Sequence, residues 1–259
     1  MNLLKRLFRV IHYKQKQIKF MKTTVKQVET YSRLVGLCTE NGSMFNPAKD
    51  SIKIEALESL LATARQKHQM VNDAHHTLMS AINNRNDALI EMRSKCTRAA
   101  NAAVVLIDQP SLIEDIKKNL SKIRGYRLGA QQVKDAPSET GPPGQEFKKS
   151  RGPIAYLTIS SKLDHFDKFI KCLNTPAYTP NEPDITYEGL QAFLAEIKVM
   201  QSQVSTGWSA NRMARDQFSA IVHSADGIYG ISKLIKTYIK SVFGPSSNAY
   251  HIVRQLKFR

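Results

Sequence analysis

The chain has 259 residues, of which 42% are hydrophobic and 23% charged, and this share of apolar side chains excludes a chain that is disordered throughout. Its net charge of +16 permits an anionic partner: nucleic acid, an acidic membrane surface or an acidic protein. The three cysteines, Cys38, Cys96 and Cys172, are odd in number and far apart, which argues against a disulfide framework and predicts a reducing compartment.

Residues 1–23 form a basic extension ahead of the first predicted helix, and residues 1–20 contain no acid. We expect neither a signal peptide nor a transmembrane segment, because no apolar run is long enough for either, so a cytoplasmic location is predicted. Three interpretations of the extension stay open: an arm that binds a membrane surface or nucleic acid, a disordered tail, or sequence upstream of a usual start at Met21. Its cations are Lys5, Arg6, Arg9, Lys14, Lys16 and Lys19.

Residues 24–128 are predicted to form a first helical repeat unit. Apolar residues three and four apart predict a helix over 24–39, which the turn residues at 41–43 end. A long helix follows, whose apolar positions alternate in steps of four and three, the seam of helices packed side by side. Further helices are expected over 97–107 and 111–123, the second with Ser111 and Glu114 at capping-box spacing. The seam positions are Leu57, Leu61, Ala64, His68, Val71, Ala74, Leu78, Ile82, Arg85, Leu89 and Met92.

Residues 129–153 are rich in proline and glycine and are predicted to be a linker. The second repeat unit, 154–259, repeats the order of the first: a helix over 159–173, a long helix with Asn181 as its expected N-cap, a helix over 228–243, and a final segment over 247–258. Gly227 and Gly230 predict a bend or a close helix contact between Ala225 and Ile231. The long-helix seam is Leu190, Leu194, Ile197, Gln201, Val204, Trp208, Asn211, Arg215, Phe218, Val222 and Ala225.

Eight apolar or proline residues of the two units match at one constant difference in number, 133, as in Phe45 and Tyr178 or Leu57 and Leu190. The match predicts an internal duplication. Each unit is a pair of long helices with one uncovered seam, and the two seams would bury each other. We therefore expect an all-α protein, an elongated antiparallel helical bundle with pseudo-twofold symmetry, in which both units pack as one domain.

No catalytic, cofactor or metal site is predicted from the sequence. His68, His75 and His76 lack the spacing of ligands on one helix face, and solvated or packed side chains explain them better. The run 164–167 (Asp-His-Phe-Asp) has residue types suited to acid–base chemistry but no nucleophile motif nearby, and an exposed polar face is the simpler interpretation. Phosphate-binding glycine loops and the common hydrolase motifs do not occur.

Two groups of residues are candidates for binding. Polar residues within the long seams are expected to be buried and to pair across the bundle, or to line a ligand site: Arg85, Asp87, Asn211, Arg215 and Asp216. Basic residues at corresponding places near the ends of the two units are expected to form a salt-sensitive patch: Lys122, Arg124, Arg127, Arg254, Lys257 and Arg259.

Several short motifs occur along the chain: Asn46-Pro47 with the Leu-x-x-Leu-Leu of the first long helix, its Asn84-Arg85-Asn86-Asp87, then 178–182 (Tyr-Thr-Pro-Asn-Glu) and the ending Ser241-Val242-Phe243-Gly244 with Leu256-Lys257-Phe258. In these motifs the chain resembles a bacterial family of internally duplicated, all-helical proteins of uncharacterised activity. The resemblance covers about residues 24–259 and implies a bacterial, duplicated helical protein with no activity to transfer.

Three functions are weighed from these features. We expect a non-enzymatic structural or protein-interaction bundle, because every strong pattern in the sequence is a packing pattern, with another protein or a second copy as partner. The alternatives are a membrane-acting helical protein, like pore-forming toxins with long hairpins, and a basic module that binds an anion or nucleic acid.

Overall fold

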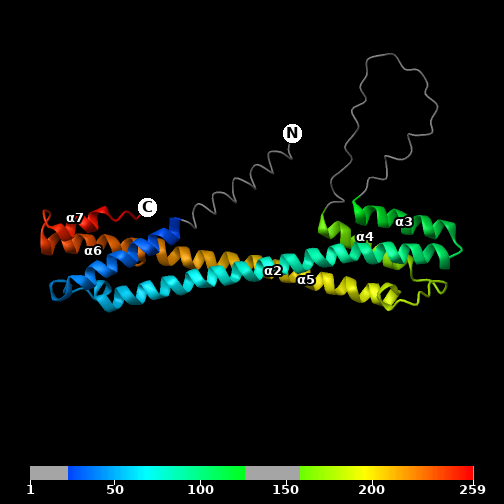
Figure 1. Cartoon of the computed structure of the whole chain (residues 1–259), viewed down its shortest axis with the longest axis horizontal. Coiled ribbons are helices and arrows are strands. Elements are labelled where there is room, and N and C mark those ends of the chain that lie inside the picture. Colours follow the sequence, from blue (N-terminus) through cyan, green and yellow to red (C-terminus); the bar gives the residue numbers. More distant parts are fainter. Residues whose placement is uncertain (1–22, 126–157, 259) are drawn as a thin grey trace, which may run out of the picture. The chain divides into compact units, whose positions relative to one another are not determined.

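A computed structural model describes residues 23–125 and 158–258, and within these ranges the chain is all-α, with no strand (Figure 1). The expected all-helical class is confirmed. The predicted linker 129–153 and the basic extension up to residue 22 lie outside the described residues. The elements are a helix over 23–40, then η1 (Gly42–Met44), η2 (Asp50–Ile52), α2 (Ile54–Leu106), α3 (Pro110–Arg124), α4 (Ile159–Cys172), η4 (Pro183–Ile185), α5 (Tyr187–His223), α6 (Ile228–Phe243) and α7 (Asn248–Gln255).

The helices form two compact units, and each unit combines segments from both halves of the chain. Unit 1 contains the described residues up to 79 and those from 206 onward, whereas unit 2 contains residues 80–205. The two longest helices therefore contribute to both units: α2 passes from unit 1 into unit 2, and α5 passes from unit 2 into unit 1. The compact units do not follow the predicted sequence division into 24–128 and 154–259.

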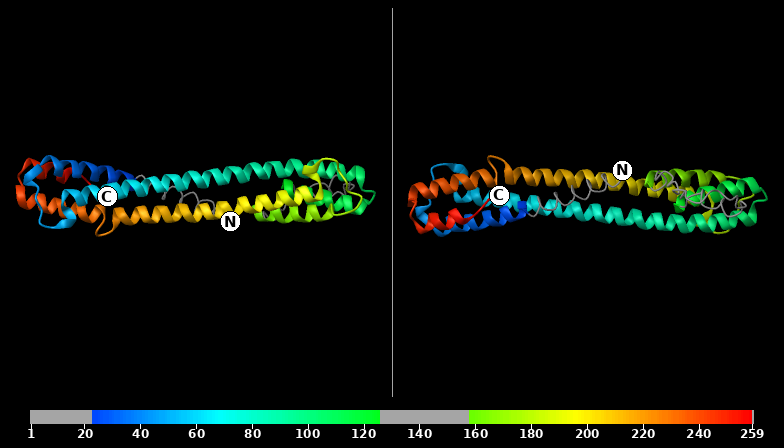
Figure 2. Two further views of the ribbon diagram at one scale, coloured as in Figure 1. Left: turned by 90° about the horizontal axis from the view of Figure 1, so that it is seen from below. Right: turned by 90° about the horizontal axis from the view of Figure 1, so that it is seen from above.

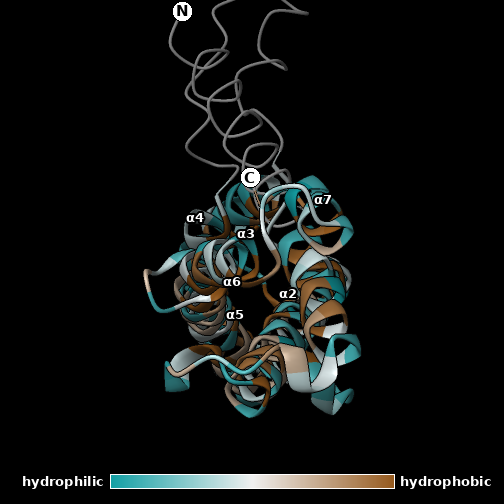
Figure 3. Cartoon of the chain, turned by 90° about the vertical axis from the view of Figure 1, so that its left-hand side faces the viewer, coloured by the Kyte–Doolittle hydropathy of each residue, from teal (hydrophilic) through white to brown (hydrophobic). Residues whose placement is uncertain are grey.

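In unit 1, the helix over 23–40 and the first half of α2 pack with the end of α5, α6 and α7 around one apolar core. The two long helices run antiparallel there: Lys67 donates from Nζ to Gln217 Oε1 at 3.0 Å, and further along α2 Leu78 faces Gly207. The fully buried Tyr31 donates its hydroxyl to the carbonyl of Leu57, at 3.5 Å, which ties the first helix to the start of α2. Brown, hydrophobic residues lie on the helix sides that face one another (Figure 3).

Unit 2 has its own core, between the second half of α2, α3, α4 and the first half of α5. The α3 and α4 helices pack against each other and on the long helices (Figure 2). Large aromatic side chains fill this core, and Phe166 meets Phe193 edge to face with ring centroids 6.5 Å apart. The buried Tyr178 donates its hydroxyl to the carbonyl of Ile185 at 2.7 Å and so fixes the loop that leads into α5.

The prediction of a separate helix over 97–107 is wrong, because α2 continues without interruption from Ile54 to Leu106. The second half of the chain does break, between His223 and Ile228, and glycines explain the difference. A Cβ atom at Gly227 would lie 2.2 Å from the carbonyl oxygen of Ile221, and one at Gly230 would lie 1.7 Å from that of Ala225. The predicted close contact at these glycines is confirmed, and no glycine occupies residues 91–97 of α2.

The helix caps agree with the sequence patterns at some ends and not at others. Gly244, with φ at 83°, ends α6, and the Ser247 hydroxyl accepts from the backbone N–H of Tyr250 at the start of α7. Asn181 is not the N-cap of α5: the η4 turn intervenes, and Thr186 Oγ1 accepts from the backbone N–H of Gly189 at 3.0 Å. The expected Ser111 cap is also wrong, because α3 already begins at Pro110.

Replacing Gly230 by alanine is expected to destabilise the protein, because the new methyl group would collide with the backbone of Ala225. We expect the free energy of unfolding to fall by about 1–3 kcal/mol, as for other overpacked sites. Urea unfolding followed by circular dichroism measures the change.

The matched control is Gly36→Ala, in the helix over 23–40, where a Cβ atom would meet nothing within 4 Å. Alanine is the better helix former by about 0.8–1 kcal/mol, so this variant is expected to gain stability. Equal stability of the two variants would contradict the close contact at Gly230.

Candidate functional site

In unit 2, the polar positions of the seam between α2 and α5 are Arg85 and Gln201. Arg85 Nη1 donates to Gln201 Oε1 at 3.3 Å, and Arg85 Nη2 donates to Asn86 Oδ1 at 3.0 Å. The Nε atom of Arg85 is buried and donates to no protein atom. The guanidinium group is therefore held between the two long helices, as the sequence predicted for this residue, with one of its donors unused.

In unit 1, the seam holds two further polar residues, Asn211 and Arg215. Asn211 is only 3% exposed, and its Oδ1 accepts no hydrogen bond from the protein. Arg215 is half-buried, and its Nε atom is buried and donates no hydrogen bond to the protein. In the same unit, the rings of His68 on α2 and Phe218 on α5 pack against each other, with their centroids 5.3 Å apart. Burial of Asn211 agrees with the prediction, but the predicted pairing across the bundle does not form at its oxygen.

Three seam predictions are wrong. Asp87 and Asp216 are exposed, and Asp216 instead lies 3.8 Å from Nε of Arg212 one turn away on the same helix. Each aspartate is next to or two positions from a seam arginine, and a helix turns by about 100° per residue, so both face away from the packed side. Trp208 is 52% exposed, because the buried Gly207 takes the seam position against Leu78.

Replacing Asn211 by alanine is expected to stabilise the protein by about 1 kcal/mol, because alanine is the better helix former and a buried acceptor without a partner is removed. The same urea measurement on Leu78→Ala, a seam residue of unit 1 that is 1% exposed, is expected to show a loss of about 2–5 kcal/mol. Loss of stability in Asn211→Ala would show instead that this amide contributes to packing.

The predicted basic patch divides between the two units. Lys122 and Arg124 end α3 in unit 2, and Arg124 Nη2 donates to Thr97 Oγ1 at 2.7 Å. Arg254 and Lys257 are exposed in unit 1, on and just after α7. Arg127 and Arg259 lie outside the described residues. A single patch made of all six residues stays a prediction.

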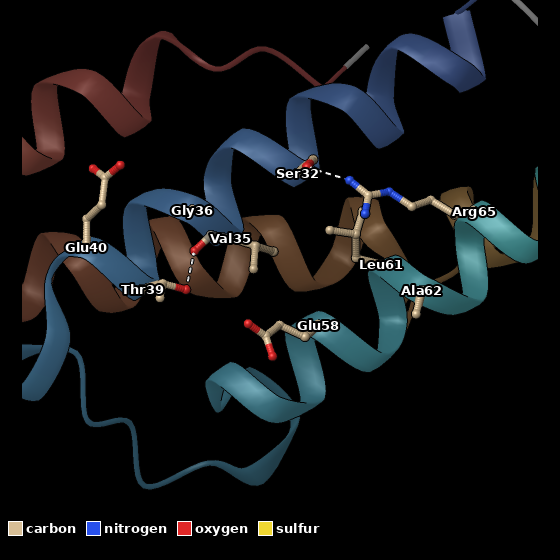
Figure 4. A pocket seen from close by; sticks show the side chains of 9 residues that line it. All are labelled: Ser32, Val35, Gly36, Thr39, Glu40, Glu58, Leu61, Ala62 and Arg65. Atoms are coloured by element: carbon tan, nitrogen blue, oxygen red, sulfur yellow. Dashed lines mark hydrogen bonds between the residues drawn. The ribbon is translucent and has the colours of Figure 1, made fainter.

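A groove of about 590 Å³ lies between the helix over 23–40 and the start of α2 in unit 1 (Figure 4). Val35, Gly36, Leu61 and Ala62 contribute apolar lining, and Arg65 Nη2 donates to Ser32 Oγ at 3.0 Å across one end of it. Two carboxylates, those of Glu40 and Glu58, lie toward the other end (Figure 4). No sequence pattern predicts this groove, because two helices line it and apolar spacing does not reveal where two helices cross.

A second groove, of about 360 Å³, lies between α2 and α5 in unit 2. Lys95 crosses it: its Nζ lies 4.1 Å from the centroid of the Phe193 ring and 3.0 Å from Glu91 Oε1. Asp87 and Glu196 add two more carboxylates to the rim. Exposed Asp87 thus belongs to a surface groove and not to the buried seam.

Within the described residues, the histidines and acids do not assemble into a metal centre. Across the part of the chain that the structure describes, no three side chains of His, Cys, Asp or Glu come close enough to hold a metal ion. In the 164–167 run, His165 is 8% exposed, so the expected exposed face is wrong for this residue. Burial and the nearby Lys122 and Lys168 lower the pKa of His165, with Asp164 acting in the opposite sense.

All three cysteines are free thiols, and their exposure differs. Cys38 and Cys96 are fully buried, and burial raises the pKa of the Cys38 thiol to about 12 and that of Cys96 further. Cys172 is half-buried at the end of α4, and burial and Asp115 raise its pKa while Asn119, 4.0 Å away, opposes this. Cys38 and Cys96 therefore behave as small core side chains.

We expect a disulfide reagent to react with one thiol of the native protein, that of Cys172, and with two more only after unfolding in urea, because reaction requires an accessible thiolate. The reagent is 5,5′-dithiobis(2-nitrobenzoic acid), followed by absorbance. Cys172→Ser should remove the fast phase, whereas fast reaction of a second thiol would contradict the burial of Cys38 or Cys96.

Comparison with protein-family models, with curated proteins and with solved structures finds no match to this chain. Within residues 23–125 and 158–258, no helix is both long enough and apolar enough to cross a bilayer. The fold and the surfaces described above are therefore the basis for a function.

Proposed function

We propose that this protein is a non-enzymatic helical bundle that acts by binding another protein or a second copy of itself, and that Trp208 is at the centre of the binding surface. The observation that carries the proposal is the exposure of this side chain. It is the one tryptophan of the sequence, and 52% of it is exposed although tryptophan is usually well buried. Tryptophan is also the residue most enriched among those that dominate protein–protein binding energy.

Met79 extends this surface from Trp208 to α2. Leu78 of α2 faces Gly207 of α5 in the seam of unit 1, and the two helices run antiparallel. Met79 and Trp208 each follow one of these facing residues by one position. Because the helices are right-handed and antiparallel, the turn of about 100° from one residue to the next brings both side chains to the same side of the pair. Met79, 36% exposed, and Trp208 therefore lie on one flank. An aromatic and a flexible thioether side by side make an adaptable apolar contact surface.

The non-enzymatic assignment is supported by what the candidate catalytic residues contact. His165 is packed within α4, and Asp167 pairs with Lys171 one turn later at 2.6 Å. In the seam, the Arg85 guanidinium bonds Gln201. Each of these polar groups takes part in packing or in a local ion pair.

An internal duplication, as in the bacterial family that the sequence resembles, is part of the proposal. Adding 133 to the bounds of η2, 50–52, gives those of η4, 183–185, and adding it to the first residue of α2 gives that of α5. Two seam contacts also correspond: adding 133 to His68 and to Arg85 gives Gln201 and Phe218, so the pair His68–Phe218 maps onto Gln201–Arg85. The predicted pseudo-twofold symmetry stays a proposal that these correspondences support.

A cytoplasmic location is proposed on the free thiols. Three cysteines stay unpaired, and two of them are completely buried in the cores of the units, which is the usage typical of proteins from reducing compartments.

Site-specific photo-crosslinking tests the binding surface. The photoreactive residue p-benzoylphenylalanine replaces Trp208 in the full chain, which is irradiated in purified form and in extracts of the source cells. We expect a covalent adduct, identified by mass spectrometry as a second copy or as another protein.

The matched control places the same residue at Met213, which is 61% exposed on the same helix and about 140° around it from Trp208. No adduct is expected there. Absence of an adduct at position 208, or equal adducts at both positions, would overturn the proposal. Trp208→Ala should keep the helix content of the chain, since the side chain is not part of the core.

A further inference from the structure

The end of the chain carries an unusual charge distribution. Residues 227–258 contain no aspartate or glutamate. Helices α6 and α7 pack against each other in unit 1 (Figure 1), so the cations of both belong to one part of this unit. We call these residues the α6–α7 cationic surface: Lys233, Lys236, Lys240, Arg254 and Lys257.

Ion pairing separates these cations from several other basic groups. Some basic side chains elsewhere form ion pairs, such as Lys118 with Glu114 on α3 at 3.0 Å and Arg98 with Asp184 at 2.6 Å. No cation of the α6–α7 surface forms an ion pair with any residue that the structure describes. The acid of the neighbouring η2, Asp50, is bonded to Lys53 at 2.7 Å. The positive charge on this surface is thus not neutralised locally.

Aromatic rings hold the lysines of α6 in place. Lys233 Nζ lies 4.2 Å from the centroid of the Tyr229 ring, Lys236 Nζ lies 5.2 Å from that of Phe258, and Lys240 Nζ lies 6.0 Å from that of Tyr250. Lys236 also donates to the carbonyl of Leu256. Such ring contacts contribute about 0.5–1 kcal/mol each at exposed sites. Lysines that are already ordered lose less entropy when they bind an anion, so this surface is prepared for binding.

The arrangement on α6 fits a phosphate backbone better than a bilayer. Tyr229, Lys233, Lys236 and Lys240 lie within about 40° of one line along the helix, and the buried isoleucines of α6 are about 90–170° around the helix from it. The exposed aliphatic residues Leu234 and Val242 are about 130° or more around the helix from that line. A helix that docks on a membrane needs its apolar face free for the lipid, but the apolar face of α6 is in the core of unit 1.

We propose that the α6–α7 cationic surface binds the phosphate backbone of nucleic acid without sequence preference. Lys233, Lys240, Arg254 and Lys257 are exposed and contact phosphates, whereas half-buried Lys236 positions the end of the chain through its bond to Leu256. This inference goes beyond the proposed protein binding and does not rest on it, because Trp208 contributes nothing to the cationic surface. Trp208→Ala is therefore expected to bind nucleic acid like the parent chain.

The test compares the full chain with two triple variants of equal charge. In K233Q/K240Q/R254Q three cations of the surface are lost, and in K117Q/K198Q/R33Q three exposed cations on other helices are lost. Binding to a fluorescent DNA duplex of mixed sequence is measured by anisotropy over a range of salt concentrations. Glutamine is about as good a helix former as lysine or arginine, and circular dichroism checks that both variants keep their helix content.

We expect the surface variant to bind about tenfold or more weakly at low salt and its salt-dependence slope to fall by about 3, since each lost phosphate contact removes about 0.9. The control variant is expected to keep the parent slope. Equal losses in both variants would mean that net charge alone drives binding, and this would overturn the proposal.

Two further arms separate other sources of binding. A full-length variant with the six cations of residues 1–20 changed to glutamine is expected to lose affinity but to keep its dependence on the α6–α7 surface. If only this variant loses binding, the extension is responsible and the proposal fails.

Vesicles of phosphatidylserine and phosphatidylcholine are expected to bind more weakly than the duplex. Tighter vesicle binding that the surface variant abolishes would assign the surface to a membrane and overturn the nucleic-acid assignment.

Discussion

The structure depends on the burial of the seam along α2 and α5. Neither helix can cover its own apolar stripe, so each packs on the other, antiparallel, and the shorter helices cover what the pair leaves open. The seam is buried in each of the two compact units. In both units, α2 comes from the first half of the chain and α5 from the second half. Because α2 and α5 each contribute to both units, neither half of the sequence contains a complete core. Folding of either half alone would leave a seam in water.

Packing also explains which polar residues are buried and which are exposed. Positions that face the opposite helix are enclosed whatever their chemistry, which is why Asn211 has an acceptor without a partner and Arg85 a donor without one. Such buried polar atoms cost free energy, and they restrict the register in which two otherwise similar apolar stripes can pair.

Charged side chains are not distributed evenly over the helices. Acids and bases pair along α2, α3 and α4, whereas α6 and α7 keep their cations unneutralised and supported by rings. Part of the basic composition is thereby gathered on the α6–α7 cationic surface, which we propose as a binding site.

Most of the secondary structure follows from the sequence, because apolar spacing and turn residues act locally. The helix over 23–40, α4, α6 and the glycine end of α6 agree with their predictions. The errors occur where two local signals compete. Asn181 and Ser111 have the chemistry of caps, but a 3₁₀ turn in one case and an earlier helix start in the other move the helix end to another residue. The alternating spacing of four and three predicts Trp208 in the seam, but Gly207 lies there instead, with Leu78 so close that a Cβ atom at position 207 would be 3.3 Å from it.

By itself, the sequence determined the helical class, the long apolar seams and the basic balance of the chain, since periodicity, turn chemistry and charge are properties of neighbouring residues. It also predicted a close contact at Gly230, because glycine, which has no Cβ atom, allows another backbone segment to come close at the start of a helix. Only the tertiary structure decided how the halves share their cores, which seam polar atoms find partners, and which cations stand over aromatic rings. Each of these depends on residues that are distant in the chain, such as Arg85 and Gln201 or Lys236 and Phe258, and their proximity is set by packing and not by local pattern.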